Sequence, residues 1–508
     1  MRITKKIITR MNITIFLLLV QIIAIYVFTN MIVSNLPLLA MLTYVISVLV
    51  VLMLVKKDKA SAYKVTWIIV IMGLPFLGGG LYLLFGDKRP VKKIAVHMQE
   101  HALIAKVLDA DTNLPDMSKL EDTRRADSFE YIRRASSYHA YENTQVKYYP
   151  MGEDMFEDML AALAQARKFI FFEYFIVKKS QMWDRLYELL AQKAAEGVDV
   201  RVVVDDLGSF KLFTKAYVAR LAQQNIKVIR FNPIVPFISL FMNNRDHRKI
   251  LVIDGHTAFN GGINIGDEYI NLTSRFGLWK DTGVRLQGDA VWSFTLMFIE
   301  TWDSFCKKEE RIDNYEFYRH TPETPAATDG LILPYGDSPL DREQLGENIY
   351  IDIINQARDY VYIFTPYLII SEKMIYAIQM AAKRGVDLRI VMPGIPDKKI
   401  VFRLSRSYYR YLLEAGARVY EYTPGFLHAK SFVSDDEIAV VGTINMDYRS
   451  LYLHFECATL LYKSSVVQEV KDDTVKAISQ SREVVLDGKK HIWNELADAV
   501  LHLAAPLM

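Results

Sequence analysis

The sequence predicts an α/β protein in which N-terminal transmembrane helices are followed by two pseudo-symmetric α/β lobes, with the active site between them. Three observations support this prediction. Runs without charged residues are concentrated near the N-terminus, short β-rich stretches alternate with helical stretches in the rest of the chain, and the second half of that polar region repeats the pattern of the first. Two copies of one unit imply a shared site between them.

The N-terminal region predicts membrane segments. Residues 11–55 contain no Asp, Glu, Lys or Arg, and this run is about twice the length that one helical crossing needs. We divide it into segments of about 13–33 and 38–55, because turn-forming residues lie near its middle. A third uncharged run, residues 65–86, contains several Gly residues and a Pro, so it either crosses the membrane or re-enters it. Lysines on both of its sides leave this choice open.

Two pairs of similar segments locate the duplication. Residues 166–171 resemble residues 357–362, and residues 197–202 resemble residues 385–390, at offsets of 191 and 188 residues. We therefore predict five regions. They are a membrane anchor (residues 1–90), a connector (91–140), a first lobe (141–315), an interlobe linker (316–330) and a second lobe with a C-terminal helix (331–508).

The composition excludes several classes of protein. Among 508 residues there are 61 Lys and Arg and 59 Asp and Glu, so no basic excess indicates a nucleic-acid partner. The two cysteines, Cys306 and Cys457, are too few for a disulfide framework and match no zinc-ligand spacing. We expect both to be ordinary buried thiols.

Each half of the polar region contains the pattern His-x-Lys-x4-Asp, followed at an equal distance by Asn. The Lys begins an apolar strand-like segment, so His and Lys project from the same face. An imidazole beside an ammonium suits attack on phosphorus, because Lys and Asn can bind phosphate oxygens while a neutral imidazole serves as nucleophile or as acid and base. The motif residues are our candidate catalytic set, and we expect a structural or pairing role for each Asp. The residues are His247, Lys249, Asp254 and Asn264 in the first half, and His428, Lys430, Asp435 and Asn445 in the second.

Two further carboxylates are candidates to orient the imidazoles. A carboxylate on the second ring nitrogen stabilises an imidazole that becomes charged during catalysis. Glu456 follows the second motif and Asp281 lies at the similar place after the first motif. From this order we expect Glu456 to orient His428 and Asp281 to orient His247, with a surface carboxylate as the alternative for either acid.

The paired motifs, with Gly-Gly-Ile-Asn at 261–264 and Gly-Thr-Ile-Asn at 442–445, resemble those of the phospholipase D superfamily. Within it, the sequence is similar to bacterial cardiolipin synthases, above all in Gly-Phe-Leu-His-Ala-Lys at 425–430 and Asn-Met-Asp-Tyr-Arg-Ser at 445–450. The resemblance covers residues 65–508. It implies two phospholipase D-like lobes in a multi-pass protein of the bacterial cell membrane. If residues 65–86 re-enter the membrane, the catalytic lobes lie on its cytoplasmic face.

The resemblance also implies an activity. A phosphatidyl group would pass from one phosphatidylglycerol to another, giving cardiolipin and glycerol through a phosphatidyl-histidine on His247, while His428 moves the protons. No metal and no cofactor would be needed, and no phosphate-cradling glycine loop is found. The expected partners are phosphatidylglycerol and membrane lipids, without nucleic acid, and the sequence does not determine the oligomeric state.

Several alternatives stay open. The same motifs occur in phospholipase D-type hydrolases, in other phosphatidyltransferases and in nucleases, and a noncatalytic membrane scaffold is a further candidate. The offset between the halves falls to 181 residues at the motif histidines, so the first lobe has extra residues before His247. Their apolar part, residues 233–242, either guides a lipid headgroup or packs as a buried loop. The helical stripe in residues 492–507 favours packing on the core over contact with the membrane.

Overall fold

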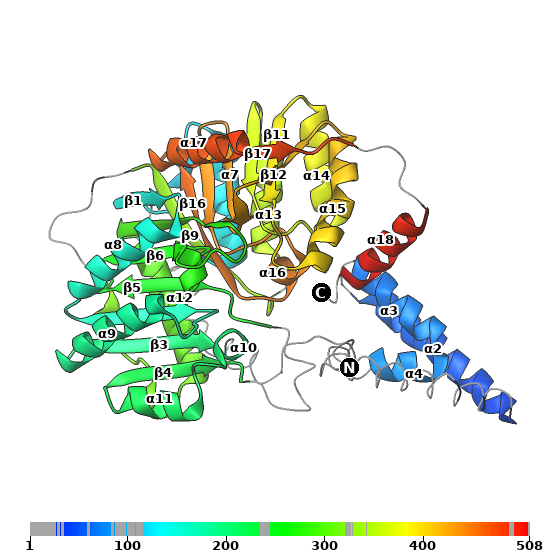
Figure 1. Ribbon diagram of the computed structural model, residues 1–508, viewed down its shortest axis with the longest axis horizontal. Helices are drawn as coiled ribbons and strands as arrows, with labels where there is room; N and C mark the ends of the chain where they lie inside the picture. The colour runs from blue at the N-terminus through cyan, green and yellow to red at the C-terminus, as the bar shows by residue number, and fades with distance from the viewer. Residues whose placement is uncertain are drawn as a thin grey trace, which may run out of the picture. The chain divides into compact units, whose positions relative to one another are not determined.

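A computed structural model gives the fold of the chain (Figure 1). It describes residues 35–57, 61–82, 115–233, 244–320, 329–341, 343–486 and 492–505, together with Val27, Met31, Gly86, Met98, Val107 and Ala327. Predicted segment 13–33 and the apolar residues 233–242 lie almost entirely outside the described residues. The chain forms two compact units, Met1–Lys88 and Arg89–Pro506.

The N-terminal unit contains three described helices, α2 (Pro37–Lys56), α3 (Ser61–Gly73) and α4 (Pro75–Leu81). Trp67 and Ile71 of α3 pack with Leu54 of α2 in a small apolar cluster. Within the described residues, α2 is the one helix that is long and apolar enough to span a membrane, and α3 contributes a shorter apolar stretch. The third predicted segment is thus divided into two short helices, with Pro75 beginning the second of them.

The first lobe alternates strands and helices from Thr144 onward. In chain order it contains β1 (Thr144–Tyr149), α8 (Gly152–Ala164), β2 (Phe169–Tyr174), α9 (Gln181–Ala195), β3 (Asp199–Asp205), α10 (Asp206–Ser209), α11 (Lys215–Ala222), β4 (Ile226–Phe231), β5 (Lys249–Ile253), β6 (Thr257–Gly261), β7 (Leu278–Lys280), β8 (Gly283–Gly288) and α12 (Val291–Phe305). A preceding helix, α7 (Thr123–Ser136), packs on the second lobe.

The second lobe repeats this sequence of elements. It contains β9 (Leu331–Asp337), α13 (Leu345–Gln356), β10 (Tyr360–Phe364), α14 (Glu372–Lys383), β11 (Asp387–Pro393), α15 (Lys399–Leu413), β12 (Arg418–Tyr422), β13 (Gly425–Leu427), β14 (Ser431–Ser434), β15 (Ile438–Gly442), α16 (Tyr448–Tyr452), β16 (Glu456–Tyr462), α17 (Val466–Ser479), β17 (Ser481–Glu483) and α18 (Ile492–Ala504).

The two large sheets share one strand order, and this confirms the predicted duplication. The first sheet runs β1-β8-β6-β5-β2-β3-β4 and the second runs β9-β16-β15-β14-β10-β11-β12, with β17 added at its far edge. In each sheet three neighbouring strands are parallel, and the strand that begins after the motif histidine pairs antiparallel with the first of them. The motif strands β5 and β14 therefore occupy equivalent central places.

The apolar core extends from one lobe into the other. Successive residues of β2 point to opposite faces of the sheet, as a strand requires. Ile170 and Phe172 pack in the cluster that contains α8 and α9, whereas Phe169 and Phe171 pack in the cluster that contains α12 and most of the second lobe. In Figure 1 the two sheets lie in neighbouring parts of the molecule, and α12 of the first lobe contacts β9, the edge strand of the second sheet. This shared core holds the inner edges of the lobes together.

The C-terminal helix α18 does not bury the apolar stripe that its sequence contains. Its polar side contacts α15, where Arg403 pairs with Asp498 at 3.0 Å and Ser407 hydrogen-bonds His502 at 2.8 Å. Trp493 is 71% exposed, and Leu496 and Val500 are also exposed. The expectation that this stripe packs on the core is therefore wrong, because polar contacts determine which face of the helix meets the lobe.

Candidate active site

Short backbone pairings between the lobes position both motif histidines. Asp246 forms a parallel bridge with Phe455 of the other lobe, and the N–H of His247 donates to the carbonyl of Phe455 at 2.9 Å. On the other side, β13 pairs in parallel with β7, and the N–H of His428 donates to the carbonyl of Lys280 at 2.7 Å. Each histidine is thus held beside the segment that carries the other lobe's candidate carboxylate.

The two carboxylates consequently cross between the lobes. Nδ1 of His247 lies 2.8 Å from both oxygens of Glu456, and Nδ1 of His428 lies 2.6 Å from Oδ2 of Asp281. The pairing expected from chain order, Glu456 with His428 and Asp281 with His247, is wrong. It assumed that each lobe supplies both members of its own pair, whereas the interlobe backbone pairing brings each carboxylate to the opposite imidazole.

This arrangement determines which ring nitrogen is available for chemistry. A carboxylate at Nδ1 favours the tautomer with the proton on Nδ1, so the lone pair of Nε2 is left for a substrate or for a proton. Burial lowers the pKa of His247 to about 3 and that of His428 to about 4, although the paired carboxylates act in the opposite direction. Both imidazoles are neutral near pH 7, as a nucleophile or a base must be.

Each carboxylate is itself held in place. Burial alone would raise the pKa of Glu456, but the adjacent His247 keeps it well below its ordinary value. Thr443 Oγ1 donates to Glu456 at 2.5 Å. Asp281 accepts from the N–H of Thr282 at 3.0 Å, and Gly262 lies so close to its carboxylate that a Cβ atom there would collide with it. The Gly-Gly and Gly-Thr pairs that follow the two motifs thus support the two acids in different ways.

The motif lysines lie beside the histidines, as the strand alternation predicts. Lys249 Nζ donates to the carbonyl of His247 at 2.5 Å, and Lys430 donates in the same way to the carbonyl of His428. Both side chains are almost completely buried. Burial lowers the pKa of Lys249 to about 8 and that of Lys430 to about 7. Two ammonium groups therefore face one buried site, and an anionic phosphodiester would stabilise their charge.

The two asparagines are buried near these groups but differ in their contacts. Asn264 accepts from the N–H of Ile176 and donates to the hydroxyl of Tyr269, both at 3.0 Å. Within the described part of the chain, Oδ1 of Asn445 is buried without a hydrogen-bond partner. Asn264 thus stabilises its own lobe, whereas Asn445 retains unused hydrogen-bonding capacity.

The motif aspartates lie at the opposite end of their strands from the histidines. Asp254 accepts from the backbone N–H groups of Arg167, Lys168 and Phe169, and Asp435 accepts from the equivalent groups at 358–360. Both have positive φ angles, 53° and 54°, a conformation that Asp tolerates in tight turns. Their inclusion in the catalytic set is corrected accordingly: they join the motif strand to its neighbour, the structural role expected from their position.

Replacement of Asp254 by alanine should therefore impair folding rather than catalysis. Three N–H groups lose their acceptor and the left-handed turn becomes strained, so we expect the free energy of unfolding to fall by about 1–3 kcal/mol. Asp254→Asn, which keeps one oxygen and tolerates the turn, should lose less. Denaturant unfolding checks the stability, and kcat per folded molecule should change little. A loss of kcat as large as that of a histidine variant would contradict this assignment.

Two side chains that sequence reasoning missed flank the imidazoles. The ring of Trp279 lies 5.4 Å from that of His428, and the ring of His454 lies 5.5 Å from that of His247. Each comes two residues before the crossing carboxylate, and in an extended segment residues two apart share a face. That spacing was the available signal. We call the groups around His247 and those around His428 the two half-sites. They share their backbone arrangement but differ in chemistry, because an indole lies beside His428 and a third imidazole lies beside His247.

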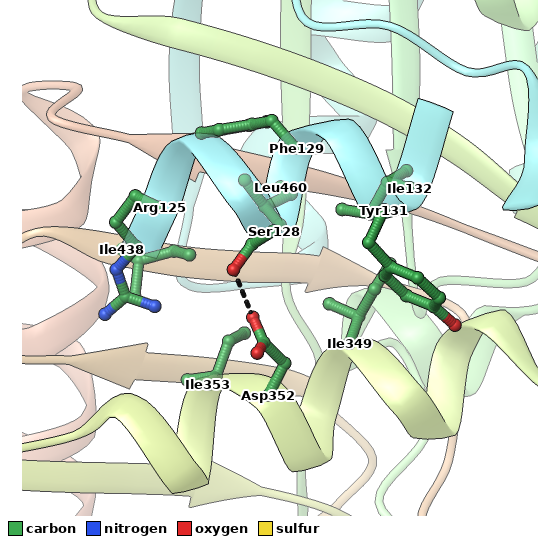
Figure 2. Close-up of a pocket in the computed structure, with 10 residues that line it drawn as sticks. All are labelled: Arg125, Ser128, Phe129, Tyr131, Ile132, Ile349, Asp352, Ile353, Ile438 and Leu460. Atoms are coloured by element: carbon green, nitrogen blue, oxygen red, sulfur yellow. Dashed lines mark hydrogen bonds between the residues drawn. The ribbon is translucent and has the colours of Figure 1, made fainter. Parts of the chain in front are cut away.

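A pocket elsewhere in the molecule is separate from these groups. Figure 2 shows it between α7 and α13, where Ser128 donates to Asp352 at 2.7 Å and side chains such as Phe129 and Ile353 form the walls. None of its ten lining residues belongs to the histidine site. The pocket lies where α7 meets the second lobe, and its lining residues include no candidate catalytic group.

Comparison with known proteins agrees with the duplicated fold. The family model described as "Cardiolipin synthase, PLD-like domain" matches residues 159–275 and 350–476, and the model "Phospholipase_D-nuclease N-terminal" matches residues 43–86. A cardiolipin synthase of Alkalihalophilus pseudofirmus is 32% identical over 458 residues, which cover 89% of this chain and 90% of that protein. The chain belongs to the cardiolipin synthase family of the phospholipase D superfamily.

Two further relatives and one solved structure are also similar to this chain. A cardiolipin synthase of Listeria welshimeri is 32% identical over 92% of this chain and 100% of its own length, and an uncharacterised protein of Streptococcus mutans is 45% identical over 90% of this chain and 99% of its own length. The crystal structure of a phosphatidylserine synthase from Haemophilus influenzae matches 72% of this chain and 95% of that chain, with a TM-score of 0.55 and 14% identity, so it supports the fold alone.

Proposed function

We propose that this protein is a cardiolipin synthase, which transfers a phosphatidyl group from one phosphatidylglycerol to another and releases glycerol. The observation that carries the proposal is the pair of buried imidazoles, each bound at Nδ1 by a carboxylate from the opposite lobe and each accompanied by a lysine. Its relatives named as cardiolipin synthases support the choice of lipid substrates.

In the first half of the reaction Nε2 of His247 attacks the phosphorus of phosphatidylglycerol. The P–O bond to the headgroup glycerol breaks, and His428 donates a proton to the departing oxygen. A phosphatidyl-histidine on His247 results. His428 is neutral in the free protein, and the bound phosphodiester raises its pKa, because a nearby anion stabilises the imidazolium.

In the second half a hydroxyl of another phosphatidylglycerol attacks the phosphatidyl-histidine. His428 accepts the hydroxyl proton, the P–N bond breaks, and His247 returns to its neutral state with cardiolipin as product. One phosphodiester replaces another, so the exchange requires no input of nucleotide energy. Lys249 and Lys430 stabilise the charge on the phosphate oxygens in both transition states, where buried cations are most effective.

The lysines should give the reaction an alkaline limit. Because burial lowers their pKa values to about 8 and about 7, these groups lose their protons as the pH rises through this range rather than above pH 10. Because the lower of the two values, that of Lys430, sets the limit, we expect kcat/KM to fall from about pH 7 upward. Lys430→Arg, whose guanidinium stays charged, should move the limit to higher pH even if its maximal rate is lower. A profile that stays flat to about pH 10 for the original protein would contradict this account.

The membrane arrangement is part of the proposal. We infer that the anchor crosses the membrane more than once and that the catalytic lobes lie on the cytoplasmic face. The length and apolar character of α2 support an anchor, and the division of residues 65–86 into two short helices supports a re-entrant segment. Single cysteines can be introduced near residues 58–60 and near Arg125 and labelled in intact cells. Their labelling shows on which side of the membrane each end of segment 65–86 lies.

The decisive experiment uses the full chain in liposomes of phosphatidylglycerol without added metal or nucleotide. Cardiolipin and glycerol should appear in equal amounts by lipid mass spectrometry and a glycerol assay. His247→Ala serves as the inactive control. Phosphatidic acid with glycerol would show that water is the acceptor, and the hydrolase would then replace the synthase as the function of this site.

A further inference from the structure

The half-site of His247 contains a set of possible metal ligands that the half-site of His428 lacks. Ligand atoms of His247, His454 and Glu456 all lie within 4.8 Å of one another. The equivalent set in the other half-site consists of His428, Trp279 and Asp281, in which the indole offers no metal ligand. The pseudo-symmetry of the lobes therefore supplies an internal comparison for the third imidazole.

His454 is largely buried beside Glu456. Its side chain is 10% exposed, and neither ring nitrogen has a hydrogen-bond partner among the described residues. A buried polar group without a partner costs free energy, so its presence calls for a physical explanation. Nδ1 of His454 lies 3.7 Å from Oε1 of Glu456, too far for a hydrogen bond but close to the spacing of two ligands around one ion.

We propose that His247, His454 and Glu456 form a zinc-binding site, and that zinc bound there inhibits the enzyme. Two histidines and one glutamate are a ligand set that Zn²⁺ accepts, with a fourth position left for water. Ligands that lie about 2.0–2.1 Å from a tetrahedral zinc ion are about 3.3 Å apart. The distances from Glu456 to the two imidazoles, 2.8 Å and 3.7 Å, lie on either side of that value, and all three ligand atoms lie within 4.8 Å of one another, so the side chains would have to draw together around the ion.

The charges around the ligands limit the affinity of this site. Zinc binds a neutral imidazole and an ionised carboxylate, and His247 and Glu456 already lie 2.8 Å apart. The ammonium of Lys249 lies nearby and opposes a cation, so we expect weaker binding than at a structural zinc site.

Inhibition follows from the nitrogen that the metal uses. Zinc on Nδ1 of His247 takes the place of the Nδ1 proton, and the ring of a neutral imidazole then carries its proton on Nε2. The lone pair that would attack phosphorus is no longer available, and the hydrogen bond to Glu456 is lost. No redox step and no further reactant are involved, and removal of the metal by a chelator restores the original tautomer.

Binding is tested first, without reference to activity. The purified full chain in detergent is treated with a chelator, then titrated with Co²⁺, whose visible absorption intensifies in a tetrahedral site. We expect one bound ion, competition by Zn²⁺, and loss of the absorption in His247→Ala and in His454→Phe. His428→Ala is the matched control from the other half-site and should bind Co²⁺ as the original protein does.

Inhibition is tested second, and this arm rests on the proposed function. The Zn²⁺ concentration that halves phosphatidyl transfer should rise at least about tenfold in His454→Phe, each variant being compared with its own metal-free rate. His454→Asn provides the same comparison if the phenylalanine variant fails to fold. His320→Gln removes an imidazole outside the site and should leave the inhibition unchanged.

The results of the two experiments distinguish the zinc site from the proposed transferase function. Equal Co²⁺ binding and equal zinc inhibition in the original protein and in both His454 variants would overturn the inference, as would the absence of binding to the original protein. Co²⁺ binding that depends on His454 in a protein without transferase activity would instead support the metal site and reject the proposed function.

Discussion

Replacement of His247 by alanine should abolish the covalent phosphatidyl intermediate, whereas replacement of His428 should leave its formation possible. The substrate that separates them is a phosphatidyl ester of p-nitrophenol, because this leaving group departs without a proton. His428→Ala should release a rapid burst of p-nitrophenolate and then stop, since no base activates the acceptor. His247→Ala should show no burst, and its rate with phosphatidylglycerol should fall by at least about 10⁴-fold.

Mass spectrometry of the stalled His428→Ala protein provides the independent readout. We expect one phosphatidyl group on a peptide that contains His247. An adduct on His428 in the original protein, together with a burst in His247→Ala, would exchange the two roles. Asp435→Asn is the matched control, because among the described residues Asp435 hydrogen-bonds to backbone N–H groups, and this variant should form and release the intermediate normally.

Neutralising the crossing carboxylates should produce the second large effect. Glu456→Gln and Asp281→Asn keep the shape of each side chain, but they remove the charge that stabilises an imidazolium and weaken the choice of tautomer. We expect kcat with phosphatidylglycerol to fall by about 10²–10⁴-fold in each variant, with a smaller change in KM. Steady-state kinetics in mixed micelles measure both constants.

The burst experiment then distinguishes which carboxylate acts on which histidine. Glu456 contacts His247, the proposed nucleophile, so Glu456→Gln should slow the burst from the p-nitrophenol ester. Asp281 contacts His428, so Asp281→Asn should leave the burst rate nearly unchanged and slow only the turnover that follows. The reverse pattern would mean that each lobe orients its own histidine in solution. Glu421→Gln, which removes the charge of a buried, ion-paired acid elsewhere, controls for the loss of a buried charge.

Local patterns accounted for the elements and for most of the site. The apolar run that follows Lys249 predicted the strand β5, the repeated motif placed its counterpart β14, and each Lys lies beside its His as a strand requires. The repeat offsets predicted the duplication, which the common strand order confirms. These predictions succeeded because periodicity and repetition are properties of neighbouring residues along one chain.

The sequence predicted less well which apolar side chains are exposed and how the N-terminal apolar segments are arranged. The stripe on α18 has helical spacing, but spacing does not specify what covers it, and hydrogen bonds to α15 turned Trp493 outward. Residues 65–86 are uncharged throughout, yet a proline divides them into α3 and α4. In both places the sequence identified the apolar residues correctly. What these residues contact could be determined only from the tertiary structure.

The sequence by itself determined the α/β class, the duplication, the two motifs and the residue types available for phosphoryl chemistry. Only the tertiary structure decided that Glu456 serves His247, that Asp281 serves His428, and that His454 stands beside one imidazole where Trp279 stands beside the other. The physical reason is that these contacts depend on backbone pairing between lobes, which joins residues about 150 to 210 positions apart. Spacing along the chain carries no information about which of two equivalent partners such a pairing selects.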